Sequence, residues 1–154
     1  MKKLINITFC FLLIIITSCG FKIVNLDRNF EILEINTSGE KKINYVIKNK
    51  LLLSSKKGNK NAIKISILTD KIKSVKEKNI NNQTTKYEIK ITSQVEYSNL
   101  SGNLAKITIT KTGSYGVASK YSDTLNNEKN LVNLLAEKII EEILNNISSS
   151  LNES

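Results

Sequence analysis

The sequence predicts an α+β domain whose elements follow in the order β-α-β-β-β-α, with a four-stranded mixed sheet and two helices packed on one face. Three patterns predict this fold. Residues 86–97 alternate between apolar and polar side chains, as in an antiparallel strand with one face in water. A second alternating run over residues 105–110 gives that strand a hairpin partner. Residues 41–57 and 128–147 instead carry apolar side chains at helical spacing.

The first strand and the first helix are expected to follow each other closely. Phe30–Ile35 is a short run rich in β-branched residues, and Asn36-Thr37-Ser38-Gly39 after it indicates a turn. Thr37 and Glu40 have capping-box spacing, which predicts a helix directly after them. Lys56-Lys57-Gly58 is expected to end that helix, because basic residues and glycine favour a helix C-terminus. The apolar positions of the helix are Ile43, Val46, Ile47 and Leu51.

Three further strands form a predicted meander. Apolar residues alternate with polar ones from residue 63 to residue 67, and the alternation breaks at Thr69-Asp70, which predicts a bulge or bend there. Polar turns are expected over residues 79–82 and 98–103, on either side of the strand over residues 86–97. The apolar face of that strand carries Tyr87, Ile89, Ile91, Val95 and Tyr97.

A long amphipathic helix is expected to close the domain. A polar stretch over residues 113–127 precedes it, and Glu128 is predicted to open it. The sequence shows no internal repeat and no Pro/Gly linker, so residues 29–154 are predicted to form a single domain after a tether over residues 19–28. The apolar positions of the helix include Leu131, Val132, Leu135, Ala136, Ile139, Ile143, Leu144 and Ile147.

The N-terminus has the layout of an export signal. Lys2 and Lys3 precede an apolar run, Leu4–Ile16, and the small residues Thr17 and Ser18 follow it. The apolar run has 13 residues, whereas a membrane-spanning helix needs about 20. We therefore predict that residues 1–18 are a signal peptide rather than a permanent anchor.

The end of this signal resembles the bacterial lipobox. Ile16-Thr17-Ser18-Cys19 has an aliphatic residue at −3, small residues at −2 and −1, and cysteine at +1. The resemblance implies lipidation of Cys19, with diacylglycerol on the sulfur and a further acyl chain such as palmitate on the amine. Several chains give the stable membrane residence that one chain does not. Gly20, in place of Asp, implies the cell outer membrane as the destination, on its periplasmic side. A soluble secreted protein remains the alternative.

Missing residue types exclude several chemistries. The chain has no histidine, and hence no Ser-His-Asp triad, no Cys-His pair and no imidazole base. Cys10 leaves with the signal and Cys19 is acylated, so the mature chain has no free thiol for a metal or a disulfide. No metal and no cofactor are expected, and the chain is predicted not to be an enzyme. An enzyme that acts on an envelope polymer with carboxylates alone stays open.

The positive charge does not indicate a nucleic-acid partner. The formal charge of +9 falls to about +7 without the signal, with 21 basic residues against 14 acidic ones. Only Arg28 is arginine, and arginine is the side chain that binds phosphate bidentately. No nucleic acid is therefore expected among the partners.

Several short segments occur in a distinctive order. The lipobox continues as Cys19-Gly20-Phe21, and the predicted strand and helix follow it. The later segments are Lys73-Ser74-Val75, Lys86-Tyr87-Glu88-Ile89, Val95-Glu96-Tyr97, Gly102, the stretch Tyr115 to Asn127, and the helix led by Glu128. In this order they resemble the LPS-assembly lipoprotein family (LptE-like).

This resemblance implies a function and partners. Members of the family sit in the lumen of a large outer-membrane β-barrel of the LptD type and help to deliver lipopolysaccharide to the outer leaflet. The resemblance therefore implies an LptD-like barrel and lipopolysaccharide as partners, and a role that plugs and supports the barrel. A pilotin-like assembly factor for another envelope complex is the alternative. In the family, basic residues near the hairpin between the second and third strands and just before the last helix are implicated in lipid A binding. Here that hairpin carries Lys73, Lys76, Lys78 and Lys86, and Lys120 lies in the segment before the last helix. The alternative for each of these lysines is surface solubility.

Overall fold

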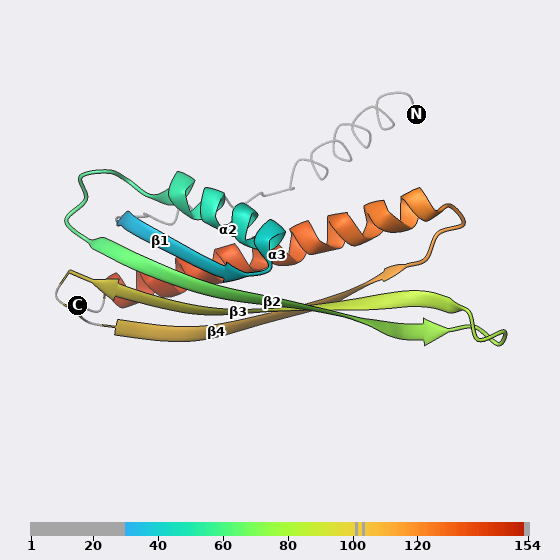
Figure 1. Cartoon of the computed structure of the whole chain (residues 1–154). Helices are drawn as coiled ribbons and strands as arrows, with labels where there is room; N and C mark the ends of the chain where they lie inside the picture. Colours follow the sequence, from blue (N-terminus) through green and yellow to red (C-terminus); the bar gives the residue numbers. More distant parts are fainter. Residues whose placement is uncertain (1–29, 101, 103, 153–154) are drawn as a thin grey trace, which may run out of the picture.

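The predicted α+β fold is confirmed. The computed structural model describes residues 30–100, 102 and 104–152. The predicted signal peptide over residues 1–18, Cys19 and the tether lie outside the described residues. In chain order the elements are β1 (Glu31–Gly39), α2 (Lys41–Ser54), β2 (Ala62–Lys78), β3 (Thr84–Asn99), β4 (Leu104–Gly116) and α3 (Tyr121–Asn152) (Figure 1).

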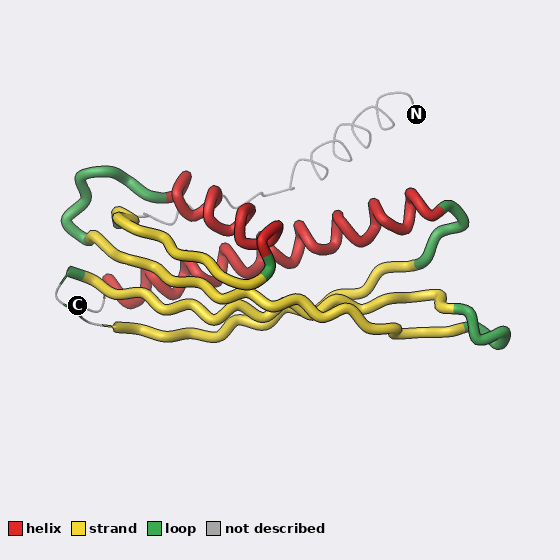
Figure 2. The backbone as a smooth tube through the Cα atoms, viewed as in Figure 1, coloured by secondary structure: helices red, strands yellow, loops and turns green. Residues whose placement is uncertain are grey.

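The four strands form one mixed sheet in the order β1-β2-β3-β4. β1 and β2 are parallel and are joined through α2, while the other two pairs are antiparallel hairpins. Both helices lie on one face of the sheet (Figures 1 and 2). The long strands extend beyond β1 and α2 to the β2–β3 turn, and we call that end of the molecule the distal end. We call the opposite end, where α3 finishes, the proximal end.

The core lies between the sheet and the helices. The predicted apolar face of β3 is confirmed, because Ile89, Ile91 and Val95 are fully buried. Isoleucine dominates this core because β-branched side chains fit the pleated face of a sheet. The largest fully buried side chains are Phe30, Ile43, Ile47, Leu51, Ile63, Ile65, Ile67, Ile89, Ile91, Ile109, Ile139 and Ile143.

β1 is longer than the sequence predicts. The expected turn over residues 36–39 continues the strand, because these residues pair with residues 66–69 of β2. The expected capping box is therefore wrong. Thr37 lies inside β1, and Glu40 precedes α2 without a side-chain cap hydrogen bond. The Glu40 N–H instead donates to the carbonyl of Thr69, at 2.9 Å, so the sheet itself fixes where the helix begins.

α2 ends earlier than the basic residues and glycine predict. Its last residue is Ser54, and the extended Ser55 follows it. The Ser55 hydroxyl accepts a hydrogen bond from the N–H of Ile32 at 2.8 Å, which ties the end of the helix to β1. Gly58 lies in the following loop with a φ of +77°, a conformation that glycine adopts without steric cost.

β2 has no bulge at Thr69-Asp70, so the predicted bulge is wrong. Its pairing with β3 is regular there and becomes irregular only between Val75 and Lys78. Thr69 continues the inward alternation and is 1% exposed. Its hydroxyl lies 3.2 Å from the buried hydroxyl of Ser93 on β3. A polar side chain can occupy this inward position because the hydroxyl of Ser93 forms a hydrogen bond with its hydroxyl.

α3 begins seven residues before the predicted position. β4 continues to Gly116 and the helix begins at Tyr121, so Glu128 lies in the third turn rather than at the helix start. The helix also approaches the sheet closely. A Cβ added at Gly113 of β4 would lie 2.7 Å from a methyl carbon of Leu131. The Leu131 side chain therefore packs directly over the backbone of β4 at Gly113.

Candidate functional site

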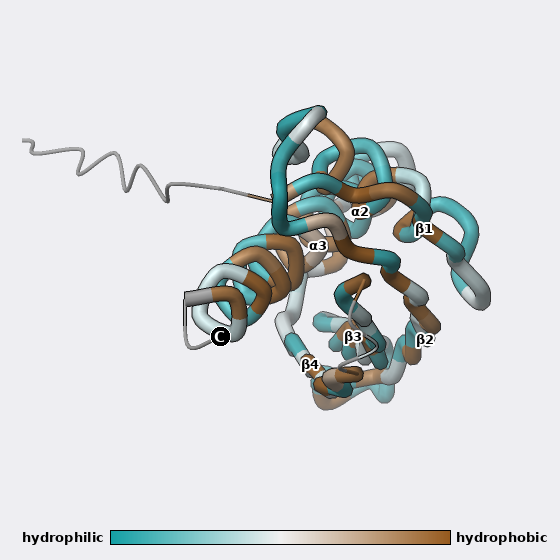
Figure 3. The backbone as a smooth tube through the Cα atoms, turned by 90° about the vertical axis from the view of Figure 1, so that its left-hand side faces the viewer, coloured by the Kyte–Doolittle hydropathy of each residue, from teal (hydrophilic) through white to brown (hydrophobic). Residues whose placement is uncertain are grey.

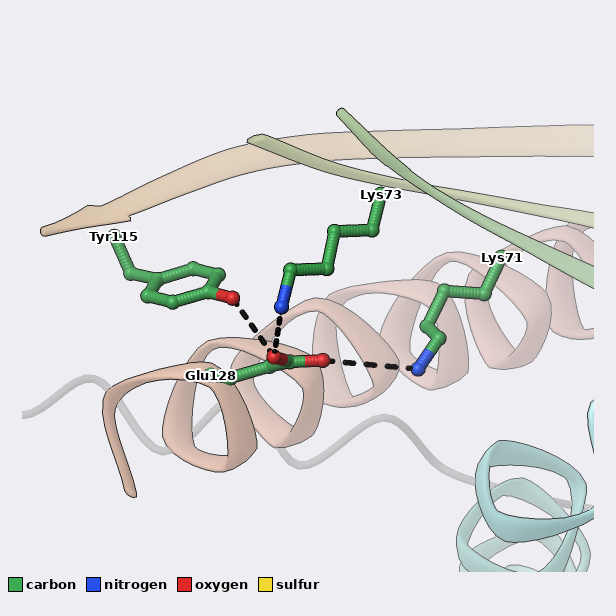
Figure 4. Close-up of polar contacts among 4 residues, drawn as sticks. All are labelled: Lys71, Lys73, Tyr115 and Glu128. Carbon is green, nitrogen blue, oxygen red and sulfur yellow. Dashed lines mark hydrogen bonds and ion pairs between the residues drawn. The ribbon is translucent and has the colours of Figure 1, made fainter. Parts of the chain in front are cut away.

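Glu128 is the centre of a polar cluster between α3 and the distal half of the sheet (Figure 4). One carboxylate oxygen accepts hydrogen bonds from Lys73 Nζ at 2.6 Å and from the Tyr115 hydroxyl at 2.7 Å. Lys71 Nζ lies 3.9 Å from the other oxygen. The cluster therefore joins β2, β4 and α3. We call Lys71, Lys73, Tyr115 and Glu128 the Glu128 cluster.

Two tyrosine rings cover the ammonium group of Lys73. The rings of Tyr87 and Tyr115 are stacked, with centroids 5.7 Å apart. Lys73 Nζ lies 4.4 Å from the centroid of the first ring and 5.5 Å from that of the second. Both distances are in the range of cation–π attraction. Lys73 is thus held by a carboxylate and by two aromatic faces together.

The surroundings fix the charges of the Glu128 cluster. The hydrogen bond from Lys73 lowers the pKa of Glu128 below its ordinary value, although partial burial acts in the opposite direction. Burial raises the pKa of Tyr115. Burial by itself would lower the pKa of Lys73, but the hydrogen bonds with Glu128 and Tyr115 raise it. Near neutral pH the carboxylate and the ammonium group are therefore charged and the phenol is neutral, an arrangement suited to holding elements together.

A groove lies beside the cluster, between the two helices. Its volume is about 520 Å³. Apolar side chains from both helices line it, together with lysines and carboxylates. Its lining comprises Glu40, Lys42, Ile43, Val46, Lys71, Leu125, Glu128, Lys129, Val132, Asn133 and Ala136.

The structure brings the five predicted lipopolysaccharide-binding lysines to the distal end. Lys73 belongs to the Glu128 cluster. Lys76 pairs with Glu88 at 3.0 Å and Lys86 with Glu77 at 2.7 Å, while Lys78 donates to the side chain of Asn82. Lys120 is exposed just before α3. The role of these lysines in lipid A binding remains a prediction. Four of them would have to give up a contact with another side chain of the protein in order to bind a lipid A phosphate.

The Glu128 cluster is not among the sites that the sequence predicts. Glu128 is expected at the helix start, and a bulge or bend is expected in the second strand at Thr69-Asp70. One signal is nevertheless present in the sequence, because Lys71 and Lys73 continue the same alternation as Ile63, Ile65 and Ile67. Lysines on the inward side of a strand call for a carboxylate from another element.

The described residues contain neither a membrane-spanning helix nor a metal cluster. No helix in the described part of the chain is long and apolar enough to cross a membrane. Within residues 30–100, 102 and 104–152, no three His, Cys, Asp or Glu side chains gather where they could hold a metal ion.

Comparison with known proteins shows a shared fold. No family model and no curated protein matches the chain. A candidate lipoprotein from Caulobacter crescentus is 13% identical, with a TM-score of 0.59 over 82% of this chain and 92% of that one. The uncharacterized lipoprotein B from Nitrosomonas europaea is 14% identical, with a TM-score of 0.56 over 86% and 93%. A minor lipoprotein from Acinetobacter baumannii is 14% identical, with a TM-score of 0.55 over 78% and 92%.

Proposed function

We propose that the chain is a lipoprotein of the cell envelope, acylated at Cys19, and that it acts without catalysing a reaction. We further propose that it plugs and supports an LptD-like barrel in the outer membrane and assists the transport and insertion of lipopolysaccharide. The lipobox supports the first statement, as does a fold shared over more than 90% of three proteins named as lipoproteins or a candidate lipoprotein. The family resemblance of the sequence supports the second.

The pairing of the strand lysines with glutamates is the observation that best supports the barrel proposal. Nine lysines lie on the strands, and seven of them form ion pairs with glutamates among the described residues. A lysine without a partner loses hydration when it is enclosed, whereas a paired lysine keeps its counter-charge. The lumen of an outer-membrane barrel is polar. The paired lysines are Lys64, Lys71, Lys73, Lys76, Lys86, Lys106 and Lys111.

The outer face of the sheet also suits a polar enclosure. It holds a shallow depression of about 280 Å³ beside the C-terminal end of β1, where β1 pairs with β2 and β2 with β3. The residues around it are mostly uncharged hydrogen-bonding side chains, which can bond to a polar wall without carrying a net charge into it. They include Asn36, Ser38, Ser66 and Gln94. The Thr110 hydroxyl on β4 adds a further such group and lies 3.2 Å from that of Thr92.

Photo-crosslinking in cells tests the proposal. A photo-reactive residue at Thr110, on the outer sheet face, is expected to capture a large barrel from solubilised outer membranes. Depletion of the protein is expected to remove lipopolysaccharide from the cell surface. Recovery of the acylated protein alone, with no barrel crosslinked to the residue at position 110, would contradict the barrel role. Loss of another envelope complex, with surface lipopolysaccharide intact, would favour the assembly-factor alternative.

A further inference from the structure

Residues 41–60, which comprise α2 and the loop after it, form a basic segment. They contain seven lysines and no acidic residue. None of these ammonium groups forms an ion pair with a carboxylate of the described chain, in contrast to the strand lysines. The nearby acids are Glu31, which accepts a hydrogen bond from the N–H of Gly58, and Glu40 before the helix. The seven lysines are Lys41, Lys42, Lys48, Lys50, Lys56, Lys57 and Lys60.

The basic segment also exposes large apolar side chains. Ile43, Ile47 and Leu51 of α2 are buried in the core. On the other side of the helix, Leu53 is 83% and Tyr45 is 71% exposed, and Leu52 is 42% exposed. Aromatic and leucine side chains flanked by lysines are typical of helices that lie in the headgroup region of a bilayer.

The loop after α2 contacts the first described residue of the chain. The N–H of Lys56 donates to the carbonyl of Phe30, the first described residue, at 3.0 Å. Cys19 is only eleven residues earlier in the sequence, a stretch that spans at most about 40 Å when fully extended. In Figure 3, α2 lies on the side of the molecule away from β3 and β4. An anchor at Cys19 would therefore hold the end of α2 near the membrane.

We propose that the basic segment docks on the surface of an anionic lipid bilayer. Tyr45, Leu52 and Leu53 enter the headgroup region, and the lysines face the lipid phosphates. Seven lysines and only two nearby carboxylates make this surface positively charged, so it is attracted to anionic lipid. A basic patch of this kind strengthens membrane attachment by an acyl anchor. This contact goes beyond the proposed function, because it requires no barrel and no lipopolysaccharide.

A single tryptophan reports the docking, because the chain has none of its own. The full-length Leu53→Trp chain is reconstituted from detergent into phosphatidylcholine vesicles with and without phosphatidylglycerol, in the presence of brominated lipid. Quenching of the tryptophan emission is expected only with phosphatidylglycerol, and added salt is expected to reverse it. The control is Ile72→Trp, since Ile72 is 53% exposed on the outer sheet face. It is expected to stay unquenched in both vesicles.

Charge variants then test the role of the lysines. In the Leu53→Trp chain, Lys56→Gln with Lys57→Gln is expected to lower the docked-to-undocked ratio about 25-fold, which corresponds to about fivefold for each lysine. The matched control, Lys90→Gln with Lys106→Gln, removes the same charge from the sheet and is expected to leave the ratio unchanged.

Two results would overturn the proposal. The first is no quenching in either vesicle, which would assign the segment to a partner other than lipid. The second is equal quenching in both vesicles, which would show that the contact does not depend on anionic lipid. The vesicles contain no barrel, so failure of the barrel proposal would leave this test unaffected.

Discussion

Replacement of Glu128 by glutamine removes the charge at the centre of the Glu128 cluster and nearly preserves its shape. The amide oxygen can still accept one hydrogen bond, but Lys71 and Lys73 lose their counter-charge. Hydrogen bonds to charged groups contribute about 1.5–3 kcal/mol. The Lys73 side chain is 38% exposed, so solvent screening reduces this figure toward the value of a surface pair, about 0.2–1 kcal/mol. We expect Glu128→Gln to lower the free energy of unfolding by about 1–2 kcal/mol.

Urea unfolding followed by circular dichroism measures this loss. Glu137→Gln is the matched control, because Glu137 is exposed on the same helix and forms no ion pair among the described residues. Its effect is expected to stay within about 0.5 kcal/mol. Equal effects of the two substitutions would refute the structural role of the cluster. A double-mutant cycle with Lys73→Met would then show a coupling energy near zero.

The pH dependence gives an independent check of the same cluster. The pKa of Glu128 is lower in the folded chain than its ordinary value of 4.5. The carboxylate therefore contributes stability that is fully present above pH 4.5 and is lost as the pH falls through the folded pKa. The stability difference between the wild type and Glu128→Gln is expected to shrink across that acidic range. A difference that is constant from neutral pH to below the folded pKa would contradict this assignment.

The remaining predictions concern a glycine, a buried hydroxyl pair and the anchor. Gly39→Ala would place a Cβ 2.0 Å from the Thr69 carbonyl oxygen and is expected to lower the free energy of unfolding by at least about 3 kcal/mol. Gly58 has open space around it, so Gly58→Ala is expected to lower it by only about 1–2 kcal/mol; urea unfolding measures both. Thr69→Val leaves the buried hydroxyl of Ser93 without its partner and should cost about 1–3 kcal/mol, and adding Ser93→Ala should recover part of that loss in the same assay. Cys19→Ser is expected to abolish labelling by radioactive palmitate and to leave the signal peptide uncleaved on immunoblots, so a labelled or processed variant would refute lipidation at this residue.

Local periodicity explains why most of the fold could be predicted. The inward face of β3 and the buried face of α3 follow from spacing alone, because a strand or helix repeats its faces at a constant interval. The prediction for residues 36–39 is wrong because their turn-like composition is overridden by parallel pairing with β2, a partner that lies across the whole of α2 in the sequence. The predicted start of α3 is wrong for a related reason, since the polar residues after Tyr121 make up its more exposed first turns.

The sequence by itself determined the order of the elements, the face that each one buries, the lipobox at Cys19 and the excess of lysine. Only the tertiary structure decided which lysines have a counter-charge. Lys73 meets a carboxylate 55 residues away, while the seven lysines of residues 41–60 meet none among the described residues. The physical reason is that the face of a strand or helix on which a side chain lies follows from the local spacing of residues in the chain. Its partner instead depends on strand register and on where a distant helix crosses the sheet.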